Sequence, residues 1–487
     1  MRSIISTVVL ATLALTGCVS MAPDYERPEA PVPQQWRGAT AASIATRGEQ
    51  ASVALGDIEW ESFFQDERLR QVIAMALEHN RDLRIALLNI EKARAQYRIQ
   101  GAELLPSVDV QASQSASRTP ASSSATGESV VSRQYSAQVG FSSYELDLFG
   151  RIRSLKDEAL QTFLSTAESQ RSTRLSLIAE VAGSWLSLAA DNELLDLARE
   201  TLESQRKTLG LSEQRHALGL DSGLDLAQVR TSVESARADV ARYQEQVEED
   251  RNALELVTGV SVPQALLPDG SVKDAIKLAP IPAGLDSSVL LARPDVVSAE
   301  HSLKAANANI GAARAAFFPT ISLTASAGRS SDQLSDLFSG ANRSWSFVPS
   351  IQIPIFNAGS LRASLDVSEV ERDITVAEYE KTIQTAFREV ADALSVRVSM
   401  QERLAAQQAL VQASSRAYQL ADARYRNGVD SYLDALDAQR SLYSAQQDLI
   451  SLSLTEATNR VTLYKVLGGG VNAQRQAVQA DHPDQSR

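Results

Sequence analysis

The 487-residue sequence contains a single cysteine and four histidines, and both scarcities limit its chemistry. One cysteine, Cys18, cannot form an internal disulfide. The histidines, at His79, His216, His301 and His482, are scattered and lack the spacing of metal ligands. Neither a phosphate-binding glycine loop nor a nucleophile-elbow motif is present. These absences predict a protein that is not an enzyme and that holds no metal and no cofactor.

Positive charge and long apolar runs are also in short supply. The net charge is −13, and it becomes −14 if Arg2 is removed with a signal peptide, which argues against nucleic acid as a partner. No apolar run after the N-terminal segment approaches the roughly 18 residues of a spanning helix. A membrane protein of this kind must be peripheral, lipid-anchored or a β-barrel.

The N-terminus has the pattern of a secretory signal. Arg2 precedes a short apolar stretch at Val8–Leu15, and Leu15-Thr16-Gly17-Cys18 resembles a bacterial lipobox. That resemblance implies a chain that begins at a lipidated Cys18, anchored by several acyl chains. Val19 stands where an inner-membrane retention signal would have aspartate, which favours the outer membrane. The alternative is an ordinary secretory signal with a chance cysteine.

Two halves of the chain resemble each other. Ala93–Ser113 matches Ala306–Ser326, and the segments around Gly219 and Gly428 match at a shift of 209 residues. The repeat is too long for a solenoid and indicates a duplicated architecture, in which two similar halves can share one ring.

Each half contains a pair of alternating segments. Apolar and polar residues alternate after Pro106 and around Ser136–Leu146, and again after Pro319 and over Trp345–Ile355. The polar positions are mostly Ser, Thr, Gln and Asp, which suit the watery lumen of an outer-membrane barrel. A soluble, half-buried sheet would alternate in the same way. Four strands cannot enclose an open lumen, whereas three chains of four strands could. The expected connecting loops are Ser115–Ser132 and Arg329–Arg343.

Long helices fill the remainder of each half. Helical spacing is expected over Glu67–Ile99, and a proline-free helix over about Ser154–Leu218. Apolar residues repeat at seven-residue steps along the hairpins, which predicts antiparallel coiled-coil hairpins. These residues are Val181, Leu188, Leu195, Leu202 and Leu209; Val233, Val240, Val247 and Leu254; Val390, Leu404 and Val411; and Leu442, Leu449 and Leu463.

Five ordered motifs carry a family resemblance. They are Ala22-Pro23-Asp24-Tyr25-Glu26-Arg27-Pro28 after the lipobox, the run Tyr144–Arg151, Ala292-Arg293-Pro294-Asp295-Val296, the run Pro354–Gly359 and the run Arg424–Arg440. Together they resemble the TolC-like outer-membrane efflux factors, in the lipoprotein branch of multidrug-efflux and nodulation-type proteins. The resemblance implies a mixed α and β fold: a homotrimer with a twelve-stranded outer-membrane β-barrel, four strands per chain, continued by a periplasmic α-helical barrel. It implies passive export, with a periplasmic adaptor and an inner-membrane pump of the RND type as partners.

Two other classes of function remain open. A lipid-anchored periplasmic coiled-coil scaffold without a pore would explain Cys18 and the heptads, but not the alternating segments. An outer-membrane factor for type I protein secretion would share the whole architecture.

The expected division of the chain follows the duplication. Residues 1–17 are the signal peptide, 18–60 a lipidated extended arm, 61–259 the first repeat, 260–292 a linker, 293–468 the second repeat and 469–487 a tail.

The candidate functional residues lie at the two glycine turns. By resemblance, the turns are the adaptor-contact tips, which comprise Arg215, Gly219, Leu220, Arg424, Gly428 and Val429. Near the second turn, Arg426, Asp430, Leu433, Asp437 and Arg440 recur at three- to four-residue steps, which predicts one helical face. The resemblance implies that this face forms a periplasmic gate, narrowest at Leu433 and Asp437, with the two arginines as counter-charges. The first-half equivalents are Ala217, Asp221, Leu224, Gln228 and Thr231. The alternative is an exposed charged helix face, whose ion pairs contribute about 0–1 kcal/mol each.

Overall fold

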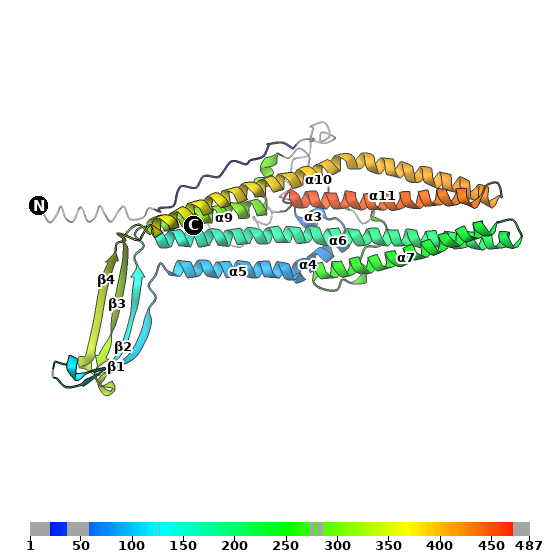
Figure 1. The fold of residues 1–487 in the computed structure, drawn as a ribbon. Coiled ribbons are helices and arrows are strands. Elements are labelled where there is room, and N and C mark those ends of the chain that lie inside the picture. Colours follow the sequence, from blue (N-terminus) through cyan, green and yellow to red (C-terminus); the bar gives the residue numbers. More distant parts are fainter. Residues whose placement is uncertain (1–19, 37–57, 126, 273–276, 280–285, 471–487) are drawn as a thin grey trace. The chain divides into compact units, whose positions relative to one another are not determined.

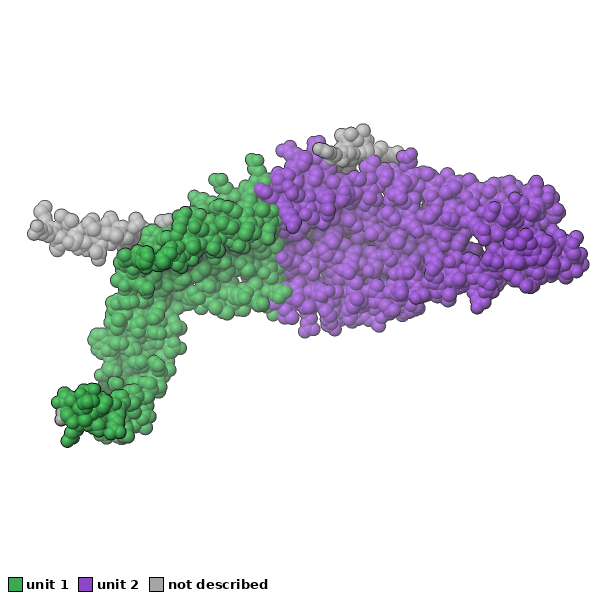
Figure 2. Space-filling model, viewed as in Figure 1, with its two compact units in different colours: residues 1–29, 89–167, 298–379 green, residues 30–88, 168–297, 380–487 purple. Residues whose placement is uncertain are grey.

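A computed structural model describes residues 20–36, 58–125, 127–272, 277–279 and 286–470 (Figure 1). The chain divides into two compact units (Figure 2). Unit 1 comprises Met1–Glu29, Asn89–Ala167 and Ser298–Tyr379, and unit 2 comprises Ala30–Leu88, Glu168–Val297 and Glu380–Arg487. Long helices and one antiparallel sheet confirm the expected mixed α and β class. Among the described residues, no helix is both long enough and apolar enough to cross a membrane.

The sheet of unit 1 has four antiparallel strands in the order β1-β2-β3-β4. The strands are β1 (Asp109–Thr119), β2 (Val130–Glu145), β3 (Thr320–Ser331) and β4 (Arg343–Gln352). The central pair, β2 and β3, therefore joins the two repeats of the chain, while β1 and β4 form the edges.

The two faces of the sheet differ as the alternation predicts. One face carries serine pairs joined by hydroxyl hydrogen bonds, at 2.8 Å for Ser113 with Ser136 and 2.9 Å for Ser326 with Ser346. The opposite face aligns apolar side chains across the strands, such as Ile321 with Ile351. Several large apolar side chains of that face, among them Val110 and Phe347, are exposed in the single chain, and Trp345 is 80% exposed.

The strands extend further than the sequence predicted. Residues expected in the loop Ser115–Ser132 belong to the ends of β1 and β2, and Ser117 and Ser132 are hydrogen-bonded across the pair at 2.8 Å. Likewise, Arg329 lies in β3 and Arg343 begins β4. The loop assignments were wrong at their ends because serine-rich segments that form one polar face have the composition of a loop.

Two glycines allow β2 and β3 to approach closely. A Cβ atom at Gly140 would lie 2.2 Å from the carbonyl oxygen of Ala325, and one at Gly328 would lie 2.3 Å from that of Ala137. Real Cβ atoms do not approach this closely, so both positions require glycine.

The N-terminal arm of unit 1 is bound to helix α9 (Pro294–Ala315). Arg27 forms an ion pair with Glu300 at 2.7 Å, and the hydroxyl of Tyr25 donates to the same carboxylate at 3.3 Å. Gly311 leaves room for the arm, because a Cβ there would lie 2.7 Å from the backbone nitrogen of Ala22. The motif that follows the lipobox therefore has a defined docking site.

The long helices of the two repeats are α6 (Arg151–Ala217) with α7 (Gly223–Thr258), and α10 (Ser360–Arg426) with α11 (Tyr432–Val466). In unit 2 the heptad positions pack as expected: Leu202 lies in one cluster with Val233, and Val240 and Val247 pack against the cluster that contains Leu195. In the second hairpin, the side-chain amide of Gln407 donates to the carbonyl oxygen of Ala445 at 3.0 Å. Apolar and polar contacts together establish antiparallel hairpins.

One expected helix is interrupted. The segment predicted as Glu67–Ile99 forms α4 (Glu67–His79) and α5 (Arg81–Ala102), separated by Asn80. Asn80 has an extended backbone (ψ 133°), and its side chain accepts from the backbone nitrogen of Leu83 at 2.8 Å. Its amide also donates to the carbonyl oxygen of Val257 at 2.8 Å, so the break is stabilised by α7.

Shorter elements complete the described chain. They are helix α3 (Trp60–Phe63) and the 3-10 helices η2 (Ala121–Ser123), η3 (Gln264–Leu266), η4 (Ser287–Ala292), η5 (Leu334–Asp336) and η6 (Gly340–Asn342).

Candidate functional site

The turns of the two hairpins have the same backbone structure. Gly219 and Gly428 adopt the left-handed conformation, each with φ of 74°. In the first turn, the nitrogen of Leu220 donates to the carbonyl of Arg215 at 2.9 Å, and in the second, Val429 donates to Arg424 at the same distance. This pattern closes a helix C-terminus and requires glycine at the left-handed position. The two repeats therefore share the backbone conformation and the hydrogen bond of this turn.

Each turn is closed further by an arginine–aspartate pair. Arg215 and Asp221 form an ion pair at 2.8 Å, with the aspartate side chain almost fully buried. At the same two positions of the second repeat, Arg424 donates to Asp430 at 2.8 Å, but both partners are more exposed. The Arg424 guanidinium lowers the pKa of Asp430 below its usual value. The first turn is therefore the better anchored of the two.

A tyrosine of the second repeat joins the two turns. Tyr425 is 2% exposed, and its hydroxyl donates to Asp221 at 3.1 Å. The guanidinium of Arg215 lies 5.2 Å from the centre of the Tyr425 ring, within the range of a cation–π contact. Burial, followed by the negative charge of Asp221, raises the pKa of Tyr425 to about 12. The hydroxyl therefore keeps its proton and remains a hydrogen-bond donor at any physiological pH.

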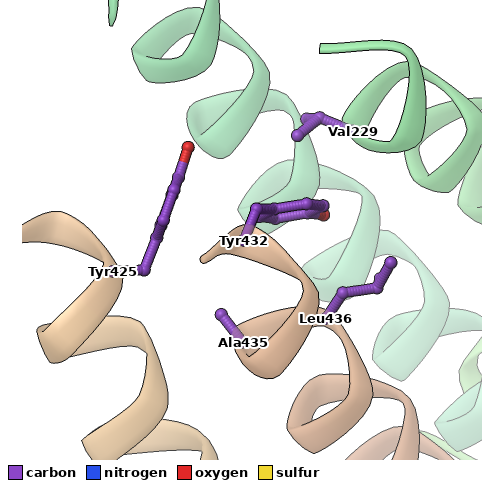
Figure 3. Packing of buried hydrophobic residues seen from close by; sticks show 5 residues of the cluster. All are labelled: Val229, Tyr425, Tyr432, Ala435 and Leu436. Carbon is purple, nitrogen blue, oxygen red and sulfur yellow. The ribbon is translucent and has the colours of Figure 1, made fainter. Parts of the chain in front are cut away.

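An apolar cluster lies beneath this link (Figure 3). Tyr425 and Tyr432 meet edge to face, with ring centres 5.4 Å apart, and Val229, Ala435 and Leu436 complete the cluster. The Tyr432 hydroxyl donates to Gln205 at 3.2 Å. This cluster and the hydrogen bonds of Tyr425 and Tyr432 help to hold the second hairpin to the first.

The outer surfaces of both turns expose apolar side chains. Leu220 is 66% exposed and Val429 is 62% exposed, at equivalent positions of the two repeats. Exposed apolar residues beside charged ones are typical of a surface that binds another protein. All six residues of the predicted tips lie in these two turns or in the last helical turn before them.

The expected gate residues do not share one helical face, and that prediction was wrong. Arg426 is the last residue of α10 and Asp430 lies in the turn, so only Leu433, Asp437 and Arg440 are on α11. The three- to four-residue spacing was extended across Gly428, although a left-handed glycine ends a helix. Arg426 pairs with Asp422 at 2.8 Å. Leu433 is 48% exposed. Within the part of the chain that the structure describes, Asp437 has no ion-pair partner.

The two tyrosines that join the hairpins were not predicted from the sequence. At the 209-residue shift, Tyr425 replaces His216 and Tyr432 replaces Gly223, so the second repeat gains an aromatic side chain at both positions. This difference between the repeats could have identified the two tyrosines from the sequence. The predicted lipidation site, Cys18, lies outside the described residues. Across those residues, the structure contains no cluster of three or more groups suited to a metal ion.

Comparisons with known proteins agree with this architecture. A family model described as outer membrane efflux protein matches residues 72–260 and 285–469, one match for each repeat. The toluene efflux pump outer membrane protein TtgC of Pseudomonas putida is 50% identical over 469 residues, covering 96% of both chains. The outer membrane protein OprJ of Pseudomonas aeruginosa is 44% identical over 467 residues, again covering 96% of both chains. Among solved structures, the open state of the MtrE outer membrane channel of Neisseria gonorrhoeae has a TM-score of 0.83 at 38% identity, covering 93% of this chain and 99% of that one.

Proposed function

Because the chain belongs to the outer membrane efflux protein family, we propose that it is the outer-membrane channel of a tripartite efflux system. In this role it exports small molecules passively from the periplasm to the exterior and catalyses no reaction. The observation that carries the proposal is the sheet, which has one hydroxyl-lined face, one apolar face and two unpaired edges.

The open edges support a homotrimer. Backbone groups on the outer sides of β1 and β4 have no strand beside them in the single chain. Such groups cannot remain unpaired inside a bilayer, so β4 of one copy must pair with β1 of another. Three copies of four strands then close a twelve-stranded barrel, with the serine pairs lining its lumen and the apolar face toward lipid.

The hairpin turns are the proposed docking sites for a periplasmic adaptor, which connects the channel to an inner-membrane pump of the RND type. The exposed Leu220 and Val429 support this assignment, since equivalent apolar positions recur on both turns. The lipidated Cys18 adds a second attachment to the outer membrane.

The α11 residues Leu433 and Asp437 are the proposed gate. Three copies of an unpaired Asp437 around a narrow axis would repel one another, and Leu433 would form an apolar constriction beside them. The link from Tyr425 to Asp221 then holds the closed state, and adaptor binding opens the gate by shifting the second hairpin to another packed arrangement.

The rival functions make different predictions for one experiment. Purified protein is reconstituted in a planar bilayer, and its single-channel conductance and its mass by light scattering are recorded. Discrete conductance steps from a trimer support the proposal, whereas a protein that binds membranes without conducting would be the coiled-coil scaffold. Transport of a small dye, but not of an unfolded polypeptide, through the complete pump assembly would separate efflux from type I protein secretion.

A further inference from the structure

The apolar face of the sheet ends in a group of arginines. Each of the four strands contributes one, and all four occupy positions that alternate in step with the apolar residues. They are Arg118, Arg133, Arg329 and Arg343, and we call them the arginine row. All lie toward the segments that connect β1 with β2 and β3 with β4, at the end of the strands away from the helices.

Two of these arginines are direct neighbours. Arg329 and Arg343 face each other across the β3–β4 ladder. Side chains at such positions lie close enough for like charges to destabilise the pair. The guanidinium of Arg329 donates to the carbonyl oxygen of Ser339 at 2.8 Å, a neutral partner that leaves its charge uncompensated. The sheet therefore maintains a repulsive contact that a bound anion would relieve.

Among the described residues, no carboxylate forms an ion pair with these arginines. Arg118 donates to the hydroxyl of Ser129 at 3.3 Å, which is a neutral partner. The acidic residues of the two connecting segments are Glu128, Asp332 and Asp336. None of them is ion-paired with the arginine row in the parts of the chain that are described.

The arginine pair also borders a shallow hollow on the apolar face. The hollow has a volume of about 550 Å³ and is lined by Val139, Ala327, Arg329, Phe338, Arg343 and Trp345. Phe338 and Trp345 are 72% and 80% exposed, so the hollow combines apolar walls with two guanidinium groups at one end. An anionic headgroup attached to an acyl chain has the same division, with charge at one end and hydrocarbon at the other.

We propose that the arginine row binds the phosphorylated headgroup of an outer-leaflet lipid. The proposal rests on the proposed function, in which the apolar face contacts the bilayer. Guanidinium groups bind phosphate through paired hydrogen bonds, and a phosphate monoester carries nearly two charges, which matches the Arg329–Arg343 pair. The exposed Trp345 is suited to the adjacent interface, where amphipathic rings of membrane barrels concentrate.

The test measures lipid retention by the intact trimer. Wild type and Arg329→Gln, Arg343→Gln protein are incubated with diphosphorylated lipid A in detergent, and bound lipid is counted by native mass spectrometry. We expect at least a tenfold loss of retention, since each basic residue near an anionic surface contributes about fivefold in affinity. The control Arg230→Gln, Arg237→Gln removes equal charge from the helical hairpin and should retain lipid like wild type. Arg329→Lys, Arg343→Lys should retain more lipid than the glutamine variant and less than wild type, because lysine keeps the charge but loses the paired hydrogen bonds.

Several outcomes would overturn the assignment. Equal retention by the glutamine variant would show that the pair does not bind lipid A. Displacement of the lipid by millimolar inorganic phosphate would assign the site to free phosphate. If the double variant does not form trimers, Arg343→Gln alone is measured. Single-channel conductance separates the two proposals: conducting wild-type trimers with equal retention defeat only the lipid site, whereas non-conducting wild type defeats the channel.

Discussion

Acid should strengthen the first helical hairpin through a pair of aspartates. Asp191 of α6 and Asp250 of α7 face each other, and the Oδ2 atom of Asp250 is buried with no hydrogen-bond partner among the described residues. Burial, and then the neighbouring Asp250 carboxylate, raises the pKa of Asp191 to about 7. A proton on Asp191 supplies the donor that Asp250 lacks, so the folded hairpin holds that proton more tightly than the unfolded chain does.

The direction of the pH effect follows from this linkage. Because the folded pKa lies above the ordinary value of 3.8, the stabilisation is complete below about pH 4 and is lost progressively as the pH rises through about 7. A shift of about three units corresponds to an upper limit of about 4 kcal/mol. Asp191 is partly exposed, so screening by solvent reduces the expected effect to about 1–2 kcal/mol.

Asp191→Asn should remove this dependence. Asparagine is neutral at every pH, and its amide can donate to Asp250. We therefore expect the variant to match wild type near pH 4 and to exceed it by about 1–2 kcal/mol of local stability near pH 8. Hydrogen exchange of the amides in residues 186–197 and 245–254, corrected for intrinsic rates, measures this stability directly.

A matched control is available on the same helix. Asp196 pairs with Arg199 on the surface and is 70% exposed, so Asp196→Asn should leave the pH dependence of wild type unchanged. If wild type and Asp191→Asn lose protection in parallel from pH 5 to pH 8, the shared proton does not stabilise the hairpin and the reasoning fails.

Three further predictions concern the anchor, the gate and the sheet. Cys18→Ser should lower the mature mass by the acyl groups of a triacylated cysteine, and an intact mass of wild type without lipid would contradict the anchor. Leu433→Ala with Asp437→Ala should raise single-channel conductance and sensitise cells to large antibiotics, while Gln228→Ala in the first repeat should do much less; unchanged conductance in trimeric double-variant protein would exclude this gate. Gly328→Ala should destabilise the sheet by about 3 kcal/mol or more, because its methyl group would overlap the β2 backbone, and a melting temperature equal to wild type would show that the strands can separate without cost.

The features predicted best were those with a short sequence period. Alternation at every second residue placed Ile321 and Ile351 on one face, and the structure pairs them across the ladder. The helix ends at the two turns were equally predictable from their glycines, because few other residues adopt the left-handed conformation. The predicted strand ends were wrong because serine is common both in loops and on a polar sheet face, as at Ser117 and Ser132.

Long-range contacts were the least predictable. The hydrogen bond between Tyr425 and Asp221 joins residues 204 positions apart, and no local pattern specifies it. The helix break at Asn80 was not predictable from the sequence for a related reason. Apolar residues keep helical spacing on both sides of it, while the partner that stabilises the break, the carbonyl of Val257, lies in a different helix.

The central β2–β3 seam affects how many molecules must meet during assembly. Within one chain this seam joins a hairpin of the first repeat to a hairpin of the second, and the proposed β4–β1 seam between chains joins the same kinds of hairpin in the other order. An unduplicated ancestor with one hairpin would need six molecules to close the same ring. Joining two hairpins in one chain makes every second seam intramolecular, so fewer molecules must meet to close the ring. It also raises the local concentration of neighbouring hairpins. Fusion also lets the two repeats diverge, so that Tyr425 stands where the first repeat has His216, and Asp437 where it has Gln228.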